Sequence, residues 1–375
     1  MSQQWILVEG HIALPSGKRW FMPLQIVLPL LLAAVYIITT ILNVQQQRMQ
    51  QMITNSPFVA KTGTTLMMKG APLHLIGYNW HWLGTGCSTP TDAEIDTTFS
   101  QIATASHGNV IRTAFYQSGS NDGFYTNFDR YIQYAKRYGL YIVPILVNQL
   151  ASCEPAKTMS RGLWYQGGYM QPDDGYPLSF RTYAIRLAAH YANEPTIAFW
   201  QLVNEPDADP CGAAGAQTLR NFADDMTTAL KAADPNHMVD LGVPGQCAGD
   251  TIADYTTIVG GQVDLCDVWH DYQEPATPLP SQMSQRLTTC QNLNKPAFVG
   301  ESGICADIDS NQTCTGTVTP ASLQTRAQFF AAKLNAGFNA GLAGYILWNK
   351  GKSSVQDDIG PGDPTESIVA QYASP

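Results

Sequence analysis

The chain has 375 residues, of which 45% are hydrophobic, so it is long enough for one large α/β barrel or for two domains of ordinary size. Its formal net charge of −9 at pH 7 argues against a protein that binds nucleic acid, because such a protein needs a basic surface. A neutral ligand is compatible with this charge.

The first distinctive segment is an apolar run near the N-terminus. Residues 20–44 contain no charged side chain, and residues 26–42 are almost entirely apolar. A helix of this length would cross a hydrocarbon core of ~30 Å. We therefore predict a transmembrane anchor over residues 20–44, with kinks at Pro23 and Pro29, because helices in lipid tolerate such breaks.

The residues around this run set the expected orientation and domain boundaries. Lys18 and Arg19 precede the run, and this weak excess of positive charge predicts a cytoplasmic tail over residues 1–19. Residues 45–57 are polar and rich in glutamine and would form a stalk, followed by one domain outside the cytoplasm over residues 58–375. The alternative is a signal peptide whose cleavage would release the domain, although such peptides have an apolar core of only ~7–15 residues.

Eight cysteines follow the apolar run. An even number of cysteines outside the cytoplasm indicates disulfides, which persist in an oxidising compartment. No Cys-x-x-Cys pair is present in the sequence, which argues against a zinc site or a dithiol redox site. Cys305 and Cys314 bracket a short polar loop and are predicted to form one disulfide, while the other pairings stay open.

Beyond residue 58 short apolar runs alternate with longer amphipathic segments, a pattern typical of a parallel sheet with crossover helices. The apolar runs predict eight strands, the number that closes a (β/α)8 TIM barrel, over residues 74–79, 110–114, 141–147, 197–203, 238–241, 265–269, 297–300 and 344–348. Helices are predicted over residues 92–106, 124–138, 178–191, 217–233, 251–259, 282–293 and 322–337. A hairpin over residues 66–73 would close the bottom of the barrel.

The fourth predicted strand is flanked by the same three residue types on both sides. Asn193-Glu194-Pro195 precedes it, and Asn204-Glu205-Pro206 follows it. Enzymes with parallel α/β barrels place their chemistry at the carboxyl ends of the strands. We therefore assign Glu205 to the functional face and Glu194 to a turn at the opposite rim.

A second carboxylate ends a short apolar strand, because Glu301 directly follows residues 297–300. Glu205 and Glu301 are the two glutamates placed at strand ends on one face. Glycoside hydrolysis needs such a pair, since one carboxyl group protonates the leaving oxygen and the other attacks the sugar or activates water. The sequence therefore predicts a glycosidase site.

Several short motifs resemble the cellulase family, glycoside hydrolase family 5, and its wider clan of barrel enzymes. The likeness extends over about residues 66–348 and rests on the order Gly77-Tyr78-Asn79-Trp80, Ile111-Arg112, Asn204-Glu205-Pro206, His270-Asp271-Tyr272, Gly300-Glu301 and Trp348. The resemblance implies a retaining hydrolase that acts on a β-linked polysaccharide or oligosaccharide of the mannan or glucan type. Glu205 would be its acid/base and Glu301 its nucleophile, and we expect a monomer that needs no metal and no cofactor.

The resemblance also implies substrate-binding roles. Asn204 would contact the sugar 2-hydroxyl, Arg112 would keep Glu301 ionised, His270 and Tyr272 would orient the two carboxyl groups, and Trp348, with Trp80, would contact the sugar. A buried arginine needs a partner, so a structural ion pair between Arg112 and an aspartate is an alternative. Trp348 could instead fill the barrel.

The sequence departs from the family at the end of the third strand, where many members have a histidine and this chain reads Leu146-Val147-Asn148-Gln149. Two other functions stay open, a carbohydrate-binding barrel without catalysis and a transglycosylase that uses the same two glutamates. The sequence contains no Gly-x-Ser-x-Gly elbow, no His-Glu-x-x-His and no P-loop, the motifs of serine hydrolases, zinc proteases and nucleotide-binding enzymes.

Overall fold

The computed structural model describes residues 7–8, 11–12, 22–23, 31–45, 56–80, 90–117, 123–148, 159–173, 175–306, 314 and 320–373. The chain forms two compact units, residues 1–55 and residues 56–375. The first unit contains a small antiparallel sheet of β1 (Leu7–Val8), β2 (His11–Ile12) and β3 (Met22–Pro23) and a helix over residues 31–45.

The prediction of a transmembrane anchor over residues 20–44 is wrong. Within the described residues, no helix is long and apolar enough to cross a membrane. A continuous apolar run suggests one long helix, but proline and the residue before it favour extended backbone. Pro23 accordingly belongs to a strand, and the described helix begins only after Pro29. The orientation inferred from Lys18 and Arg19, which lie outside the described residues, depended on this helix.

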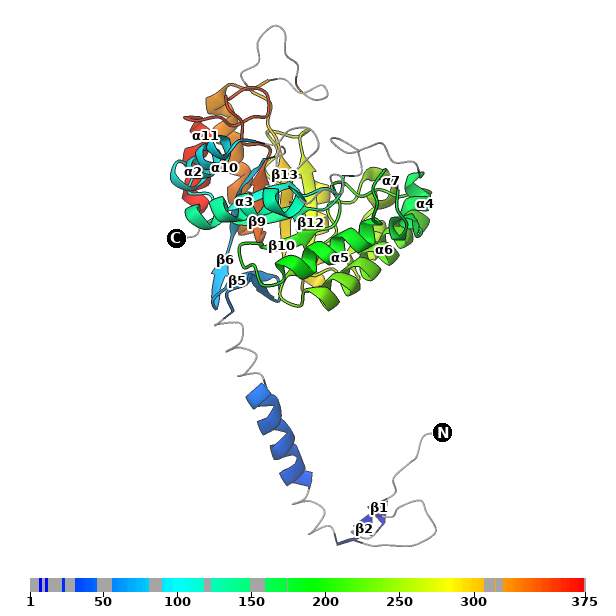
Figure 1. The fold of residues 1–375 in the computed structure, drawn as a ribbon. Coiled ribbons are helices and arrows are strands. Elements are labelled where there is room, and N and C mark those ends of the chain that lie inside the picture. The colour runs from blue at the N-terminus through cyan, green and yellow to red at the C-terminus, as the bar shows by residue number, and fades with distance from the viewer. Residues whose placement is uncertain are drawn as a thin grey trace. The chain divides into compact units, whose positions relative to one another are not determined.

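The second unit is a (β/α)8 barrel, as predicted (Figure 1). Each predicted strand run overlaps one strand of its eight-stranded sheet, and the last two residues of β12 and of β13 lie beyond the predicted ends: β7 (Leu75–Asn79), β8 (Val110–Ala114), β9 (Tyr141–Ile145), β10 (Phe199–Gln201), β11 (Met238–Asp240), β12 (Cys266–Asp271), β13 (Ala297–Ser302) and β14 (Gly344–Leu347). The paired neighbours are parallel, in the order β11-β10-β9-β8-β7-β14-β13-β12.

The barrel closes between β11 and β12. The backbone N–H of Asp264 donates to the carbonyl of Val239 at 2.8 Å, and the backbone N–H of Asp267 donates to the Asp240 carboxylate at 3.2 Å. A side chain thus replaces part of the regular ladder at this seam. As a result, two aspartates are buried inside the barrel.

The predicted helices correspond to α2 (Asp92–Thr104), α3 (Gly123–Tyr138), α5 (Phe180–Tyr191), α6 (Ala213–Ala233), α8 (Ile252–Val259), α9 (Ser281–Asn292) and α10 (Leu323–Asn339). The sequence analysis did not predict α11 (Pro364–Tyr372) or the short elements α4 (Arg161–Tyr165), η1 (Gly168–Met170) and α7 (Gln246–Gly249). In Figure 1 the helices lie around the strands, and α10 packs against α11 as α5 does against α6.

Side-chain caps explain several helix starts. The hydroxyls of Thr91, Ser179, Thr251 and Ser322 each accept a hydrogen bond from the backbone N–H three residues later. Thr91 and Glu94 complete a capping box, in which the glutamate carboxylate accepts from the Thr91 backbone N–H. These caps place each helix directly after the loop that leaves the functional end of the preceding strand.

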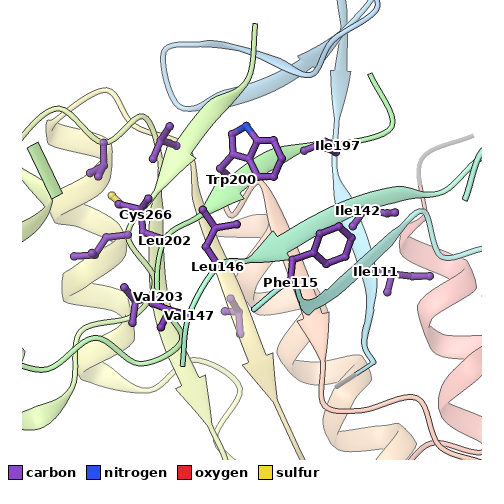
Figure 2. Packing of buried hydrophobic residues seen from close by; sticks show 14 of the residues in the cluster. Ile111, Phe115, Ile142, Leu146, Val147, Ile197, Trp200, Leu202, Val203 and Cys266 are labelled. Carbon is purple, nitrogen blue, oxygen red and sulfur yellow. The ribbon is translucent and has the colours of Figure 1, made fainter. Parts of the chain in front are cut away.

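The barrel strands alternate between two cores. Outward side chains such as Ile111 and Trp200 pack against the helices in a large apolar cluster, part of which Figure 2 shows. Inward side chains such as Phe199 and Phe298, whose rings lie 5.1 Å apart, fill the lower barrel. The next inward position on β10 is Gln201, so the barrel interior turns polar above this apolar layer.

A three-stranded sheet covers the bottom of the barrel. The predicted hairpin over residues 66–73 is present as β5 (Thr65–Met68) and β6 (Ala71–Leu73), and β4 (Ala60–Thr62) adds a third strand. Leu66 and Leu73 join the apolar cluster of the lower barrel.

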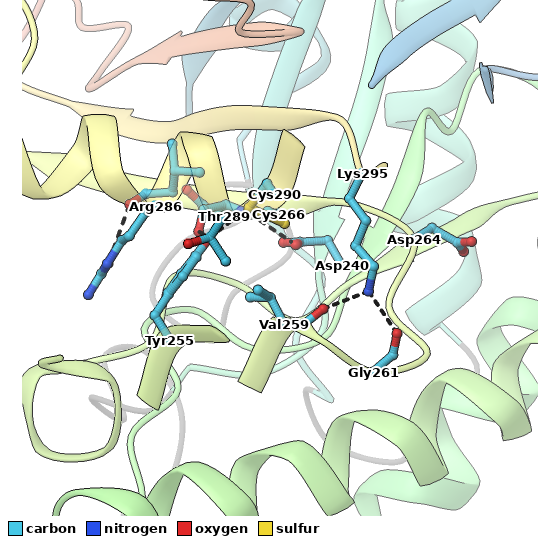
Figure 3. Close-up of a disulfide and its surroundings, with 12 residues drawn as sticks. Asp240, Tyr255, Val259, Gly261, Asp264, Cys266, Arg286, Thr289, Cys290 and Lys295 are labelled. Carbon is cyan, nitrogen blue, oxygen red and sulfur yellow. Dashed lines mark hydrogen bonds between the residues drawn. A yellow bond between two sulfur atoms is a disulfide. The ribbon is translucent and has the colours of Figure 1, made fainter. Parts of the chain in front are cut away.

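Three disulfides occur in the described part of the chain. The predicted pair Cys305–Cys314 is confirmed, and Cys211–Cys247 and Cys266–Cys290 were left open by the sequence. Cys266 on β12 bonds to Cys290 on α9 beside Asp240 and Tyr255 (Figure 3). These bonds suit an oxidising, extracellular compartment.

Candidate active site

Glu205 and Glu301 converge at the carboxyl end of the barrel. One carboxylate oxygen from each residue and one ring nitrogen of His270 all lie within 4.8 Å of one another. Glu205 lies in the loop after β10 and its side chain is 32% exposed, whereas Glu301 belongs to β13 and its side chain is 6% exposed. The two carboxyl groups are therefore close together but differ in their access to solvent.

The backbone of Glu205 lies in the left-handed region, with φ of 51°. This region costs a residue other than glycine about 1–3 kcal/mol, and such strain is often found at functional sites. The conformation turns the chain sharply after the strand. The Glu205 carboxylate then lies 3.1 Å from the Nδ1 of His270.

Arg112 on β8 is 1% exposed and holds the centre of the site. Its guanidinium donates to Glu301 at 2.6 Å and to three amide oxygens at 2.7–2.8 Å, which belong to Asn79, Asn204 and Gln201. The ion-pair partner of Arg112 is thus Glu301 and not an aspartate. A charge buried to this extent requires such complete pairing.

Glu301 accepts hydrogen bonds from both sides. Tyr272 donates its hydroxyl to one carboxylate oxygen at 2.8 Å, while Arg112 binds the other. Burial favours the neutral acid, but the charges of His270 and Arg112 and the Tyr272 hydroxyl outweigh it and lower the pKa of Glu301. Burial and the adjacent Glu301 raise the pKa of Tyr272 well above its usual value, so the hydroxyl keeps the proton that it donates.

His270 lies between carboxylates. Its Nδ1 is 3.1 Å from Glu205 and 3.6 Å from Glu301, and its Nε2 is 3.3 Å from Asp267. Burial disfavours the imidazolium, but the charges of Glu301 and Asp267 and the hydrogen bonds to Asp267 and Glu205 raise the pKa of His270 to about 10. His270 is therefore a cation at neutral pH.

Two asparagines lie beside the glutamates. The carbonyl oxygen of Asn204 accepts from Arg112, so its amide nitrogen faces the other way and donates to Asn148 at 3.4 Å. Asn148 belongs to the segment after β9 in which the family resemblance leads one to expect a histidine. The orientation of the Asn204 amide is thus fixed from both ends.

The two tryptophans occupy different environments. Trp80 follows β7, is 7% exposed and packs edge-on against Phe99 in the helix-facing core. Trp348 follows β14, is only partly buried, and its backbone N–H donates to the carbonyl of Ser302, next to Glu301. The backbone of Trp348 thus lies beside the end of β13, close in the chain to Glu301, whereas Trp80 packs mainly in the core.

Four residues of the network were given no role from the sequence, although one of them, Asn79, belongs to a motif that carries the family resemblance. They are Asn79, Gln201, Asp240 and Asp267, all at most 1% exposed. Gln201 donates to Asp240 at 2.8 Å and to Asp267 at 3.2 Å. Burial and the neighbouring Asp267 raise the pKa of Asp240 to about 7. Polar residues inside otherwise apolar strands were the available signal, but the sequence analysis considered mainly the residues at strand ends.

A cavity of about 400 Å³ extends from Glu205 and His270 along the ends of β10, β11 and β12. Trp269, Arg161 and Asp207 are among its lining residues. Arg161 donates to Asp207 at 3.1 Å, and the same carboxylate accepts from the Ala248 backbone N–H at 2.8 Å. The Cys211–Cys247 disulfide also joins the segment after β10, which contains Asp207, to the segment after β11, which contains Ala248. This side of the cavity is therefore held in place beside Glu205. The long segment between β9 and α5 lies partly outside the described residues.

The chain is similar to curated mannanases of plants. It is 26% identical over 216 residues to putative mannan endo-1,4-beta-mannosidase 9 of Oryza sativa subsp. japonica, covering 52% of this chain and 53% of that protein. It is 28% identical over 223 residues to mannan endo-1,4-beta-mannosidase 4 of Solanum lycopersicum, covering 52% and 55%. The chain thus spans about half the length of the curated relatives that it matches first.

Solved structures share the fold at lower identity. The glycoside hydrolase family 5 mannosidase of Rhizomucor miehei superposes with a TM-score of 0.60 at 16% identity, covering 85% of this chain and 97% of that one. The endoglucanase Cel5A catalytic domain of Thermobifida fusca gives 0.55 at 17%, covering 82% and 89%.

A family model decides the classification. The model of the cellulases, glycosyl hydrolase family 5, matches residues 66–349, which is well over half of the chain. This range contains the barrel strands and both glutamates. The chain therefore belongs to the cellulase family, glycosyl hydrolase family 5.

Proposed function

We propose that this protein is a retaining hydrolase that cleaves β-1,4-linked mannan outside the cytoplasm, with Glu301 as nucleophile and Glu205 as acid/base. The observation that supports the mechanism most directly is the separation of the two carboxylates, whose nearest described oxygens lie within 4.8 Å. Retaining glycosidases hold the two carboxyl groups ~5–5.5 Å apart, whereas inverting ones leave room for a water at ~6.5–9.5 Å. The choice of mannan follows from the names of the plant relatives.

The different environments of the two glutamates support the assignment of roles. Glu301 is paired with Arg112 and accepts from Tyr272, and its lowered pKa keeps it anionic, as an attacking group must be. Glu205 has no arginine or lysine within salt-bridge distance among the described residues, and it lines the open cavity. A group that both gives and takes a proton needs this access to a leaving oxygen and then to water.

In the first step the Glu301 carboxylate attacks the anomeric carbon and forms a glycosyl ester. The bond from that carbon to the leaving oxygen breaks, and Glu205 donates its proton to this oxygen, so the shortened glycan leaves as an alcohol. In the second step Glu205 takes a proton from water. The resulting hydroxide attacks the anomeric carbon, the ester bond breaks, and Glu301 returns to its anionic form with the configuration of the sugar retained.

The proposal is tested by incubating the purified full chain with β-mannan, carboxymethylcellulose, mixed-linkage glucan and xylan. We expect shortened products from mannan, and NMR of the first product should show the β-anomer before mutarotation. Glu301→Gln, in which the nucleophile is replaced by an amide of equal size, should lose this activity. An α-anomer as first product would contradict the retaining mechanism, and hydrolysis of another glycan without mannan would contradict the substrate.

A further inference from the structure

Asp267 and His270 lie three residues apart on β12, yet both side chains belong to the barrel interior. In a regular strand, residues three apart point to opposite faces. The pairing of β12 with β13 shifts register between Asp267 and Trp269 and again between Trp269 and His270. These irregularities bring the Asp267 carboxylate to 3.3 Å from the Nε2 of His270.

Both ring nitrogens of His270 thus face carboxylate oxygens. Nδ1 faces Glu205 at 3.1 Å, and Nε2 faces Asp267 at 3.3 Å. A neutral imidazole has only one N–H, so one lone pair would face a carboxylate oxygen unless that oxygen were protonated. An imidazolium donates on both sides. The geometry therefore favours the doubly protonated ring while Glu205 is a carboxylate, and the Nε2–H toward Asp267 is kept when Glu205 carries the proton that it donates in the proposed first step.

Asp267 is itself held from two directions. One of its oxygens accepts from the backbone N–H of Gly300 at 2.9 Å, and the other accepts from the Gln201 amide at 3.2 Å. A Cβ atom at position 300 would lie 2.0 Å from the Asp267 carboxylate, so glycine is required there. Gly300 directly precedes Glu301, which means that Asp267 touches both the histidine and the backbone that presents the nucleophile.

We propose that Asp267 is a positioning residue of the active site, which binds the Nε2–H of His270 and so keeps the Nδ1–H directed at Glu205 and Glu301. This inference rests on the proposed function for its kinetic readout, but its structural claim can be measured without activity. Asp267 does not touch the sugar. It acts through His270.

The charges around His270 determine the expected effect of removing Asp267. The charged groups that face the ring are Glu205 from the loop after β10, Glu301 from β13 and Asp267 from β12. Tyr272, directly after β12, and Arg112 from β8 both donate to Glu301, while Asp240 from β11 accepts from Gln201, which also donates to Asp267. Removing the Asp267 charge lowers the pKa of His270, because one of the anions that stabilise the imidazolium is lost.

The test compares Asp267→Asn with wild type in two measurements on the full chain. In protein labelled with 15N-histidine, the His270 signal, assigned by its loss in His270→Asn, should stay doubly protonated through neutral pH in wild type. In Asp267→Asn the His270 ring should lose one proton at a pH that is lower than in wild type by at least about one unit. The alkaline limb of kcat/KM, which reports the proton of Glu205 in the proposed mechanism, should move to higher pH in the same variant, because less positive charge on His270 makes that proton harder to release.

A matched control is Asp264→Asn, which removes another carboxylate near the start of β12. Asp264 forms an ion pair with Lys231 at 3.0 Å, is partly exposed, and accepts from the Val239 backbone. It should leave the His270 titration and the pH profile unchanged. Folding of both variants is checked by circular dichroism and thermal unfolding.

Three results would overturn the proposal. In the first, a folded Asp267→Asn protein loses activity equally at all pH values with the His270 titration unchanged. In the second, the Asp264→Asn control shows the same shifts as Asp267→Asn. The third result comes from wild type alone. If His270 has its ordinary pKa there and its Nε2 is unprotonated, the proposal is contradicted directly. An inactive wild type with a doubly protonated His270 would instead contradict the proposed function alone.

Discussion

The guanidinium of Arg112 donates to the carboxylate of Glu301 at 2.6 Å, and the two side chains are 0% and 6% exposed. This pair links β8 to β13 across the polar upper part of the barrel. Burial alone would make Glu301 a weak nucleophile by favouring its protonated form. The pair and its hydrogen-bonded neighbours reverse this preference, so the same interaction that stabilises the fold also prepares the proposed attacking group.

The first prediction tests that relationship. Arg112→Met should raise the pKa of Glu301, because burial is then opposed by one cation fewer. Since Glu301 must be ionised to attack, the acidic limb of kcat/KM should move to higher pH by about one unit or more. The variant should also unfold more easily by about 3–5 kcal/mol, measured by urea denaturation, because a buried charge loses its partner.

Arg137→Met is the control for this change. Arg137 forms an exposed ion pair with Asp96 at 2.8 Å on the surface of α3 and α2. Its loss should leave the pH profile unchanged and cost at most about 1 kcal/mol. An Arg112→Met profile that keeps its wild-type acidic limb would show that Arg112 does not set the ionisation of Glu301.

The second prediction separates the roles of the two glutamates. Glu205→Ala should lose much more activity on mannan than on an activated aryl glycoside, because a nitrophenolate leaves without a proton from the enzyme. Glu301→Ala should lose at least about a thousandfold on both substrates, because every leaving group requires the attack. Equal activity ratios in the two variants would contradict the assignment.

Glu194→Ala provides the internal control for Glu205. Glu194 belongs to the turn between α5 and β10, where it forms an ion pair with Lys136 at 2.6 Å and accepts from the Thr196 backbone at 3.2 Å. It thus lies at the amino end of the strand that is followed by Glu205. Activity of Glu194→Ala should stay within about twofold of wild type under conditions in which the variant is folded.

The third prediction concerns the Tyr272 hydroxyl, which donates to Glu301 at 2.8 Å. A hydrogen bond to a charged group contributes about 1.5–3 kcal/mol, so Tyr272→Phe should lower kcat about 10–150-fold. Tyr345→Phe removes a buried hydroxyl that donates to Ser302 at 3.0 Å and touches neither glutamate. A loss in Tyr345→Phe as large as that in Tyr272→Phe would indicate a structural effect.

The sequence predicted the barrel well because its strands are short apolar runs that end at polar residues, as at Glu205 and Glu301. The position of the Trp80 side chain could not be predicted, because a residue at a strand end can direct a large ring either to the site or to the helices. The buried pair Asp240 and Asp267 was missed, since an aspartate inside a strand gives no sign of whether it meets another across the barrel seam. The prediction of an anchor was wrong because Pro23 and Pro29 were expected only to kink one long helix, whereas Pro23 belongs to a strand and the described helix begins after Pro29.

The last prediction concerns the choice of sugar. Mannose and glucose differ only in the orientation of the 2-hydroxyl, which the family resemblance places near Asn204. Arg112 fixes the carbonyl of this amide, and Asn148 accepts from its nitrogen at 3.4 Å, so the two neighbours determine where the remaining N–H points. Asn148→Ala removes one of these constraints. The ratio of kcat/KM for an aryl β-mannoside to that for the matching β-glucoside should then fall by about threefold or more, a difference that corresponds to a weakened hydrogen bond.

Asn221→Ala is the control for this substitution. Asn221 accepts from Gln217 on the exposed face of α6. It should leave the substrate ratio unchanged. An unchanged ratio in Asn148→Ala, with both sugars affected alike, would mean that the orientation of Asn204 is set by Arg112 alone. In that case Asn148 would have no part in distinguishing mannose from glucose.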